Sequence, residues 1–84
     1  MQVKVKYRSR YLADIAGAAW EEMEAATVKD ILRNMRVRYG AEAEKSAKAM
    51  LIAVNGESIL HLRCYQTALH EGDEVSFMPI CGGG

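Results

Sequence analysis

Residues 28–39 carry the strongest periodic pattern in the sequence, and this pattern limits what the chain can fold into. Apolar side chains recur there at positions i, i+3, i+4 and i+7, as Val28, Ile31, Leu32 and Met35. The spacing predicts an amphipathic helix of about three turns. Thr27 is its expected N-cap, with Asp30 completing an imperfect capping box, and Gly40 is its expected end. A helix with one apolar face needs one sheet to cover that face.

The segments on either side of this helix supply strands for such a sheet. Residues 2–8 alternate strictly between apolar and basic side chains, which predicts a half-buried strand, and residues 74–80 alternate again. The apolar run at residues 49–54 predicts a strand that is buried on both faces. Asn55 and Gly56 predict a tight turn directly after it.

The other segments carry weaker patterns. Residues 18–25 alternate poorly but are expected to be extended, and residues 57–65 are expected to include a short strand. Residues 11–17 indicate a connecting turn or a single helical turn. Residues 41–48 are small and charged, which predicts a solvated connection with room for a further helical turn.

This order of elements predicts an α+β fold, a β-grasp in which a mixed sheet curls around one main helix. Trp20 and Met35 are expected in its core, and the arginines of the helix on a solvated face. A single domain is expected over residues 1–81, followed by a flexible glycine tail at residues 82–84. The chain has 84 residues, of which 50% are apolar and one is proline, so it can build a core without disulfides or metal ions.

Charge and hydropathy exclude several classes of function. Lys plus Arg and Asp plus Glu number 11 each, whereas a general nucleic-acid binder carries an excess of basic charge. No run approaches the roughly 18 apolar residues of a membrane span, and the start of the sequence lacks the apolar stretch of a signal peptide. We therefore expect a cytoplasmic protein that binds neither nucleic acid nor membranes.

The cysteines and histidines offer little site chemistry. Cys64 and Cys81 are expected to be free thiols in that compartment. His61 and Cys64 have the spacing of half a metal site, but a tetrahedral site needs more ligands than His70 and Cys81 obviously supply, so we expect no metal. The same pair lacks the glycine-rich or oxyanion context of a nucleophile. Cys81 has no Lys, Arg or His neighbour to lower its pKa, and we expect it to be a spacer.

Three motifs in the last third of the chain resemble the MoaD/ThiS family of ubiquitin-like sulfur carriers. They are AVNG at residues 53–56, HEGDEVSFMP at residues 70–79 and GGG at residues 82–84. In that family a VNG turn, a DGDEVxFxPP strand entry and a C-terminal Gly-Gly recur, and the opening VKVKYRSRYLADIAG resembles its first strand more loosely. The SFMP motif favours the MoaD branch, the small subunit of molybdopterin synthase. Ile80 in place of a second proline, Cys81 and the third glycine depart from the family pattern.

The resemblance implies a function for the last residues. An ATP-using activating enzyme, related to ubiquitin activators, would adenylate the carboxylate of Gly84, and a sulfur donor would convert it to a thiocarboxylate. Gly82 and Gly83 would form a leader thin enough to enter the channel of that enzyme. The chain would be a carrier and not an enzyme, with no bound cofactor of its own. By resemblance it would hand sulfur to a pterin precursor in a complex with the larger molybdopterin synthase subunit.

Docking to such partners is expected to use the end of the last strand. By alternation with Val75, Phe77 belongs to the core, which leaves Met78 and Ile80, with Pro79 between them, as interface residues. Three basic residues of the first strand rim this patch if they share its face: Lys4, Lys6 and Arg8.

Three alternatives stay open on the sequence alone. The same fold could deliver sulfur to a thiazole or another small molecule. It could be a protein modifier that is joined through Gly84 to lysines of target proteins. It could also be a plain interaction module with an inert tail, in which case deletion of Gly83 and Gly84 changes nothing.

Overall fold

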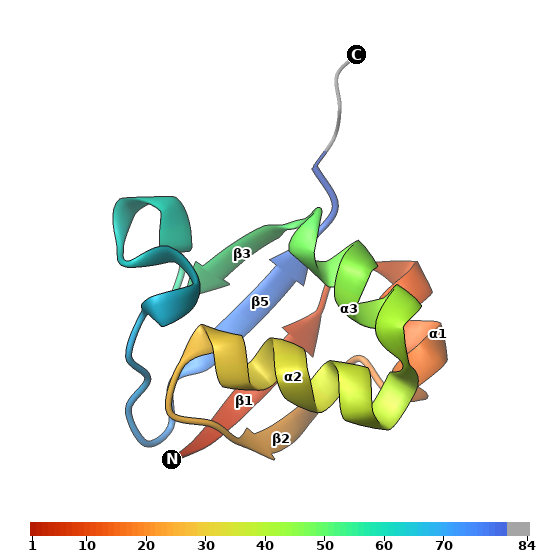
Figure 1. Ribbon diagram of the computed structural model, residues 1–84, viewed down its shortest axis with the longest axis horizontal. Helices are drawn as coiled ribbons and strands as arrows, with labels where there is room; N and C mark the ends of the chain where they lie inside the picture. Colours follow the sequence, from red (N-terminus) through yellow and green to blue (C-terminus); the bar gives the residue numbers. More distant parts are fainter. Residues whose placement is uncertain (81–84) are drawn as a thin grey trace.

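The computed structural model describes residues 1–80 and contains a mixed sheet with helices on one of its faces (Figure 1). The strands are β1 (Gln2–Tyr7), β2 (Trp20–Glu24), β3 (Leu51–Val54), β4 (Glu57–Ser58) and β5 (Glu74–Met78). The helices are α1 (Arg10–Ala16), α2 (Val28–Tyr39) and α3 (Ala41–Lys48), with two 3-10 turns, η1 (Ile59–His61) and η2 (Cys64–Gln66).

The sheet has five strands in the order β2-β1-β5-β3-β4. The central strands β1 and β5 are parallel, and every other neighbouring pair is antiparallel. Helix α2 lies across one face of the sheet, α3 packs beside α2, and α1 packs beside α3 (Figure 1). This arrangement confirms the predicted β-grasp, in which a mixed sheet curls around one main helix.

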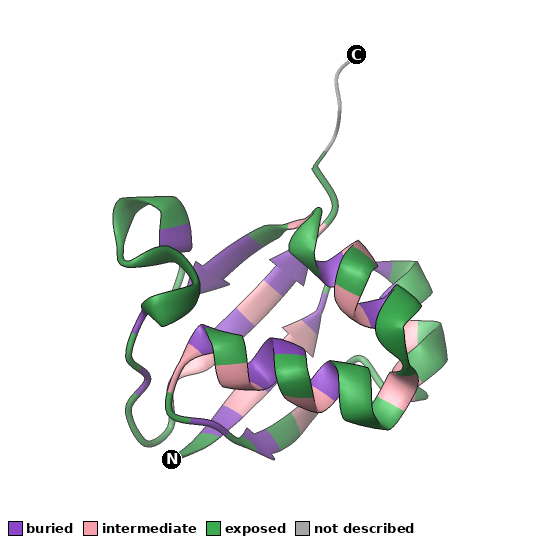
Figure 2. Cartoon of the chain, viewed as in Figure 1, coloured by how far each residue is buried: buried purple, intermediate pink, exposed green. Residues whose placement is uncertain are grey.

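The core lies between α2 and the inner face of the sheet. All four residues of the predicted helical stripe are buried, with Ile31 and Met35 at 0% exposure. They meet alternate residues of β1 and β5, including Val5 and Phe77, which are also fully buried. Figure 2 shows this division, because the turns of α2 alternate between buried and exposed residues. The predicted core positions of Met35 and Phe77 are therefore confirmed.

The ends of α2 also match their sequence signals. The Thr27 hydroxyl accepts a hydrogen bond from the Asp30 amide at 3.3 Å, and the Asp30 carboxylate accepts one from the Thr27 amide at 3.2 Å. These two bonds are the reciprocal pair of a capping box. Gly40 ends the helix with a φ of 100°, a value in the left-handed region that favours glycine.

Two connections contain more helix than the sequence predicts. Residues 10–16 form a helix with Ser9 as its N-cap, where a turn or a single helical turn was expected. Residues 41–48 form the complete helix α3, which corrects the prediction of a solvated connection. Its inner side consists of Ala43 and Ala47, both buried. Alanine favours helix strongly and is small enough to let α3 approach α2, but it adds little to an apolar pattern.

The segment after the β3–β4 turn contains the short strand that the sequence predicts. Its strand is limited to Glu57–Ser58, and the chain then continues through η1 and η2. Asn55 and Gly56 have φ values of 50° and 85°, so the predicted turn is confirmed. Because β4 pairs only with Ala53 and Val54, residues 1–80 place no strand beside the outer edge of β3 at Leu51 and Ile52.

Trp20 does not lie in the core, and that prediction was wrong. It is 49% exposed and pairs in register with Lys6, whose side chain points to the outer face of the sheet. Cross-strand partners share a face, so the register of β1 with β2 directs Trp20 outward. The Lys4 Nζ atom lies 4.3 Å from the centre of the indole ring, a cation–π contact.

A half-buried carboxylate ties the end of α2 to the β1–β2 pair. The hydroxyl groups of Tyr7 and Tyr39 both donate to Glu21 Oε2, at 2.5 and 2.6 Å. The Arg38 guanidinium donates to Glu21 Oε1 at 2.8 Å. Burial, and then the hydrogen bond to Glu21, raises the pKa of Tyr7 well above its usual range. Tyr7 therefore stays a neutral donor.

Candidate functional site

The last strand delivers the chain to the surface at one end of the sheet. β5 ends at Met78, and Pro79, which has no amide hydrogen to donate, comes directly after it. Met78 is half-buried, whereas Pro79 and Ile80 are exposed. Figure 1 shows the chain leaving the sheet at the end opposite to the N-terminus. The predicted interface residues therefore all reach the surface at this exit.

An apolar surface surrounds this exit. Leu51 pairs in register with Met78 on the outer face of the sheet and is 37% exposed, and Ile80 is 64% exposed. We call Leu51, Met78, Pro79 and Ile80 the exit patch. The sequence predicts that the strand at residues 49–54 is buried on both faces of the sheet, and for Leu51 this prediction was wrong. Only the pairing of β3 with β5 reveals that Leu51 belongs to this surface.

Lys4 and Lys6 of β1 share the outer face of the sheet with Leu51 and Met78 of the exit patch. In the register of β1 with β5, Lys4 pairs with Glu74 and Lys6 pairs with Ser76. Glu74 and Ser76 lie on the same face of β5 as Met78, because alternate residues of a strand share a face. The Arg8 amide donates to the Phe77 carbonyl at 2.9 Å, which brings Arg8 next to the end of β5. The condition set by the sequence, that the basic residues share the face of the patch, is met for Lys4 and Lys6.

The outer face thus combines an apolar end with a basic and aromatic strip. The Lys6 ammonium group pairs with Glu74 at 3.1 Å, and Lys4 lies over the ring of Trp20. An exposed tryptophan with nearby cations is a common anchor in protein interfaces. Sequence reasoning missed Trp20 as a surface residue, because residues 18–25 alternate too poorly to fix the face on which it lies.

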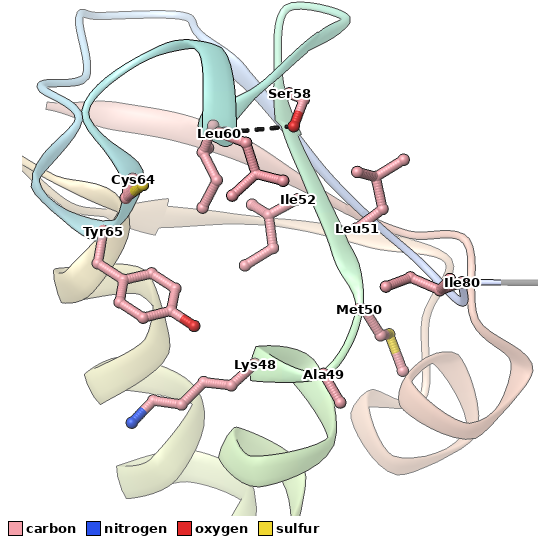
Figure 3. A pocket seen from close by; sticks show the side chains of 11 residues that line it. Lys48, Ala49, Met50, Leu51, Ile52, Ser58, Leu60, Cys64, Tyr65 and Ile80 are labelled. Atoms are coloured by element: carbon pink, nitrogen blue, oxygen red, sulfur yellow. Dashed lines mark hydrogen bonds between the residues drawn. The ribbon is translucent and has the colours of Figure 1, made fainter. Parts of the chain in front are cut away.

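A hollow of about 350 Å³ opens beside the exit patch at the unpaired edge of β3. Figure 3 shows Leu51 and Ile80 on one side of β3, and Ile52, Leu60 and Tyr65 on the other. Leu60 is 74% exposed although it is apolar. We call this space the apolar hollow. Most of the residues that line it are apolar, so it is suited to receive apolar side chains.

The remaining residues of the predicted site lie outside the described residues. These are Cys81, Gly82, Gly83 and Gly84, together with the predicted boundary between domain and tail. Their proposed roles stay predictions.

Two further properties concern only residues 1–80. His61 and Cys64 are both exposed, and this part of the chain holds no group of three or more His, Cys, Asp or Glu side chains that could bind a metal ion. Among its helices, none is both long and apolar enough to cross a membrane.

The fold and the exposed strand exit define a ubiquitin-like β-grasp protein. A solved structure with the same fold is the small archaeal modifier protein 1 of Methanosarcina acetivorans, with a TM-score of 0.83 and 26% identity over 99% of this chain and 96% of that one. The model of the ThiS family matches residues 7–84, and the chain belongs to this family. The resemblance to the MoaD/ThiS carriers is thereby confirmed.

Two relatives with higher sequence identity carry different names. The small archaeal modifier protein 3 of Haloferax volcanii is 32% identical over 77% of this chain and 77% of that protein. A solved structure from Pyrococcus furiosus, assigned as molybdopterin converting factor subunit 1, is 30% identical over 94% of this chain and 97% of that one, with a TM-score of 0.74. The chain is therefore similar both to a modifier and to a cofactor-synthesis protein.

A further fold neighbour was solved as part of a protein complex. It belongs to the complex of subunits 1 and 2 of the molybdopterin-converting factor from Helicobacter pylori, with a TM-score of 0.71 and 21% identity over the whole of both chains. At this identity the match concerns the fold alone. It provides an example of this fold bound to a protein partner.

Proposed function

We propose that the chain is a sulfur carrier whose Gly84 carboxylate is activated and converted to a thiocarboxylate. The observation that carries the proposal is the extent of the family match, which runs through residue 84 and so includes the three glycines. The exit patch supports it, because only Cys81 separates Ile80 of this exposed apolar surface from the three glycines in the sequence. A partner that docks there receives the glycines at its own active site.

The proposed chemistry has two steps. A carboxylate oxygen of Gly84 attacks the α-phosphorus of ATP, and pyrophosphate leaves. Hydrosulfide then attacks the carbonyl carbon of the acyl adenylate, AMP leaves with the bridging oxygen, and one proton is released. No electron transfer is needed when hydrosulfide is the sulfur donor.

In this proposal the activating partner supplies the catalysis. The partner is an adenylyltransferase that resembles ubiquitin-activating enzymes, and it binds and uses the ATP. The carrier contributes a thin backbone at Gly82 and Gly83, because a Cβ there would clash in a narrow channel. We accordingly assign the chain the role of a co-substrate, without a bound cofactor and without enzymatic activity of its own.

For the sulfur acceptor, we propose a pterin precursor bound by a larger molybdopterin synthase subunit. The similarity to the molybdopterin converting factor subunit from Pyrococcus furiosus supports this acceptor. Copurification of the chain with a larger pterin-binding subunit is the expected result. Transfer of the sulfur to a thiazole precursor instead would assign the chain to the alternative pathway.

A second candidate function is protein modification through Gly84. The similarity to the small archaeal modifier protein 3 supports it. In this case a lysine amine attacks the same acyl adenylate, AMP leaves, and an amide bond joins Gly84 to the target. Mass spectrometry of cellular proteins would detect lysines that carry the C-terminal glycines of this chain.

The first experiment measures the intact mass of the chain after incubation with ATP, sulfide and the activating enzyme of its host. The expected result is the mass change of one oxygen replaced by sulfur. A variant that lacks Gly83 and Gly84 is the matched control and should show no change. If a demonstrably active enzyme leaves both proteins unchanged, the carrier function is wrong, and the inert-tail module becomes the better account.

A further inference from the structure

A second hollow lies on the helical side of the molecule, away from the outer face of the sheet. Its volume is about 440 Å³, and it lies between α2, the end of α3 and η2. The residues that line it include four cations, Lys29, Arg33, Arg36 and Lys48, and one carboxylate, Glu44. We call this space the basic hollow. It stands out because the whole chain has a formal net charge of zero.

Three of these cations repel one another on the same face of α2. Lys29, Arg33 and Arg36 are spaced i, i+4 and i+7, so their side chains neighbour each other along the helix. Arg33 lies 3.7 Å from Asp30, whereas Lys29 and Arg36 have no carboxylate within 4.0 Å among residues 1–80. Lys48 lies 4.0 Å from Glu44, so the fold pairs two of the four cations and leaves the charges of Lys29 and Arg36 uncompensated among residues 1–80, at a small cost to the helix.

The basic hollow is continuous with the apolar hollow. Lys48, Cys64 and Tyr65 line both of them. Figure 3 shows the ring of Tyr65 and the side chain of Lys48 on the same side of β3. Together the two hollows form one groove, which is basic at α2 and apolar toward Leu60 and Ile80.

We propose that this groove binds an acidic segment of a protein partner. Carboxylates of the segment pair with the cations on α2, and an apolar side chain next to them enters the apolar hollow beside Leu60. A segment with this pattern matches both ends of the groove, whereas a nucleic-acid strand matches only the basic end. The basic end of the groove lies on the helical side of the molecule, whereas its apolar end shares Leu51 and Ile80 with the exit patch.

The test uses the full chain and a fluorescein-labelled synthetic peptide of consecutive glutamates followed by leucines. Fluorescence anisotropy should detect binding with a dissociation constant below about 1 mM at low salt. Affinity should fall as salt is raised, because the carboxylate contacts lie at the surface. Amide shifts of the labelled protein should change along α2, at Lys48 and in η2.

The deciding variant is the double substitution Arg33→Glu with Arg36→Glu, which should weaken binding at least about tenfold. The matched control is Arg10→Glu with Lys45→Glu, which makes the same change in net charge at exposed residues that do not line the groove. It should change the affinity less than about twofold. At the apolar end, Leu60→Ser should weaken binding about threefold or more.

Several results would overturn the proposal. They are an absence of binding at about 1 mM peptide, equal weakening by both charge variants, and amide shifts confined to the outer face of the sheet. Tighter binding of an oligouridylate than of the peptide, lost in the Arg33→Glu and Arg36→Glu variant, would assign the groove to nucleic acid instead. None of these measurements depends on Gly84, so the proposal stands or falls separately from the carrier function.

Discussion

Among single residues, Glu21 of β2 links three elements, because its carboxylate contacts residues of both β1 and α2. Its carboxylate accepts hydrogen bonds from Tyr7, Tyr39 and Arg38. Tyr7→Phe keeps the ring in the core but removes one donor to this carboxylate. We expect a loss of about 1–2 kcal/mol in the free energy of unfolding, measured by urea denaturation. An unchanged free energy would mean that the other two donors compensate fully.

Asp73 gives one residue-level contribution to the pH dependence of stability. The His70 amide, and next the Asn55 side chain, donate hydrogen bonds to its carboxylate at 2.8 and 3.0 Å, and they lower its pKa. Because the folded pKa lies below the unfolded one, this stabilisation is present above about pH 4 and is lost as the pH falls through the folded pKa.

Asp73→Asn should therefore reduce the loss of stability in acid. The test compares free energies of unfolding at about pH 7 and pH 3 in the wild type and the variant. The variant should show the smaller difference between the two values. Asp14→Asn, at an exposed aspartate of α1, is the control and should behave as the wild type does. An equal effect of the two variants would contradict the role of Asp73.

For Trp20 and Leu51, the sequence alone did not predict on which face of the sheet the side chain lies. Both are large and apolar, so burial was the reasonable prediction, yet both lie on the outer face. Their orientation follows from registers between distant segments, Trp20 with Lys6 and Leu51 with Met78. A strand that alternates poorly, or is apolar throughout, contains no local signal for that choice.

At the scale of elements, the sequence predicts a helix or strand well when several of its local sequence signals indicate the same element. Helix α2 combines an apolar stripe, a capping box and a terminal glycine, and the structure has it between Val28 and Tyr39. Helix α3 has only alanines on its buried side, so its pattern resembles that of a solvated segment. The 3-10 turns η1 and η2 were also not predicted, because three residues are too few to show a helical repeat of apolar side chains.

Ala47 tests whether α3 is a packed helix. Its side chain is completely buried, so Ala47→Glu would force a charged group into the core beside α2. We expect a loss of at least about 3 kcal/mol in the free energy of unfolding. The matched control, Ala41→Glu, adds the same side chain at an exposed position in the first turn and should change stability by less than about 0.5 kcal/mol. Similar effects of both variants would mean that α3 does not pack as described.

At the scale of the whole molecule, the fold presents two candidate surfaces for partners, which meet at Leu51 and Ile80. The outer face carries the exit patch and the strip with Trp20, and the helical side carries the groove. The sequence predicts the first surface in part, because Met78 and Ile80 follow from alternation along one strand. The groove was not predicted, because α2, α3 and η2 meet there only after folding, and the cations of α2 look by themselves like the ordinary solvated face of an amphipathic helix.

The exit patch makes a prediction about the proposed activation of Gly84. Ile80→Ser removes an apolar side chain that is 64% exposed, so it should leave thermal stability unchanged but weaken docking of the activating enzyme. We expect KM for the chain to rise about tenfold with kcat unchanged, because the lost contact is present in both the ground state and the transition state. Val37→Ser removes a comparable side chain that is 79% exposed on α2, and it should leave both constants as they are. Equal effects of the two substitutions would indicate that the enzyme does not distinguish the exit patch from the rest of the surface, and the proposed docking at the exit patch would be wrong.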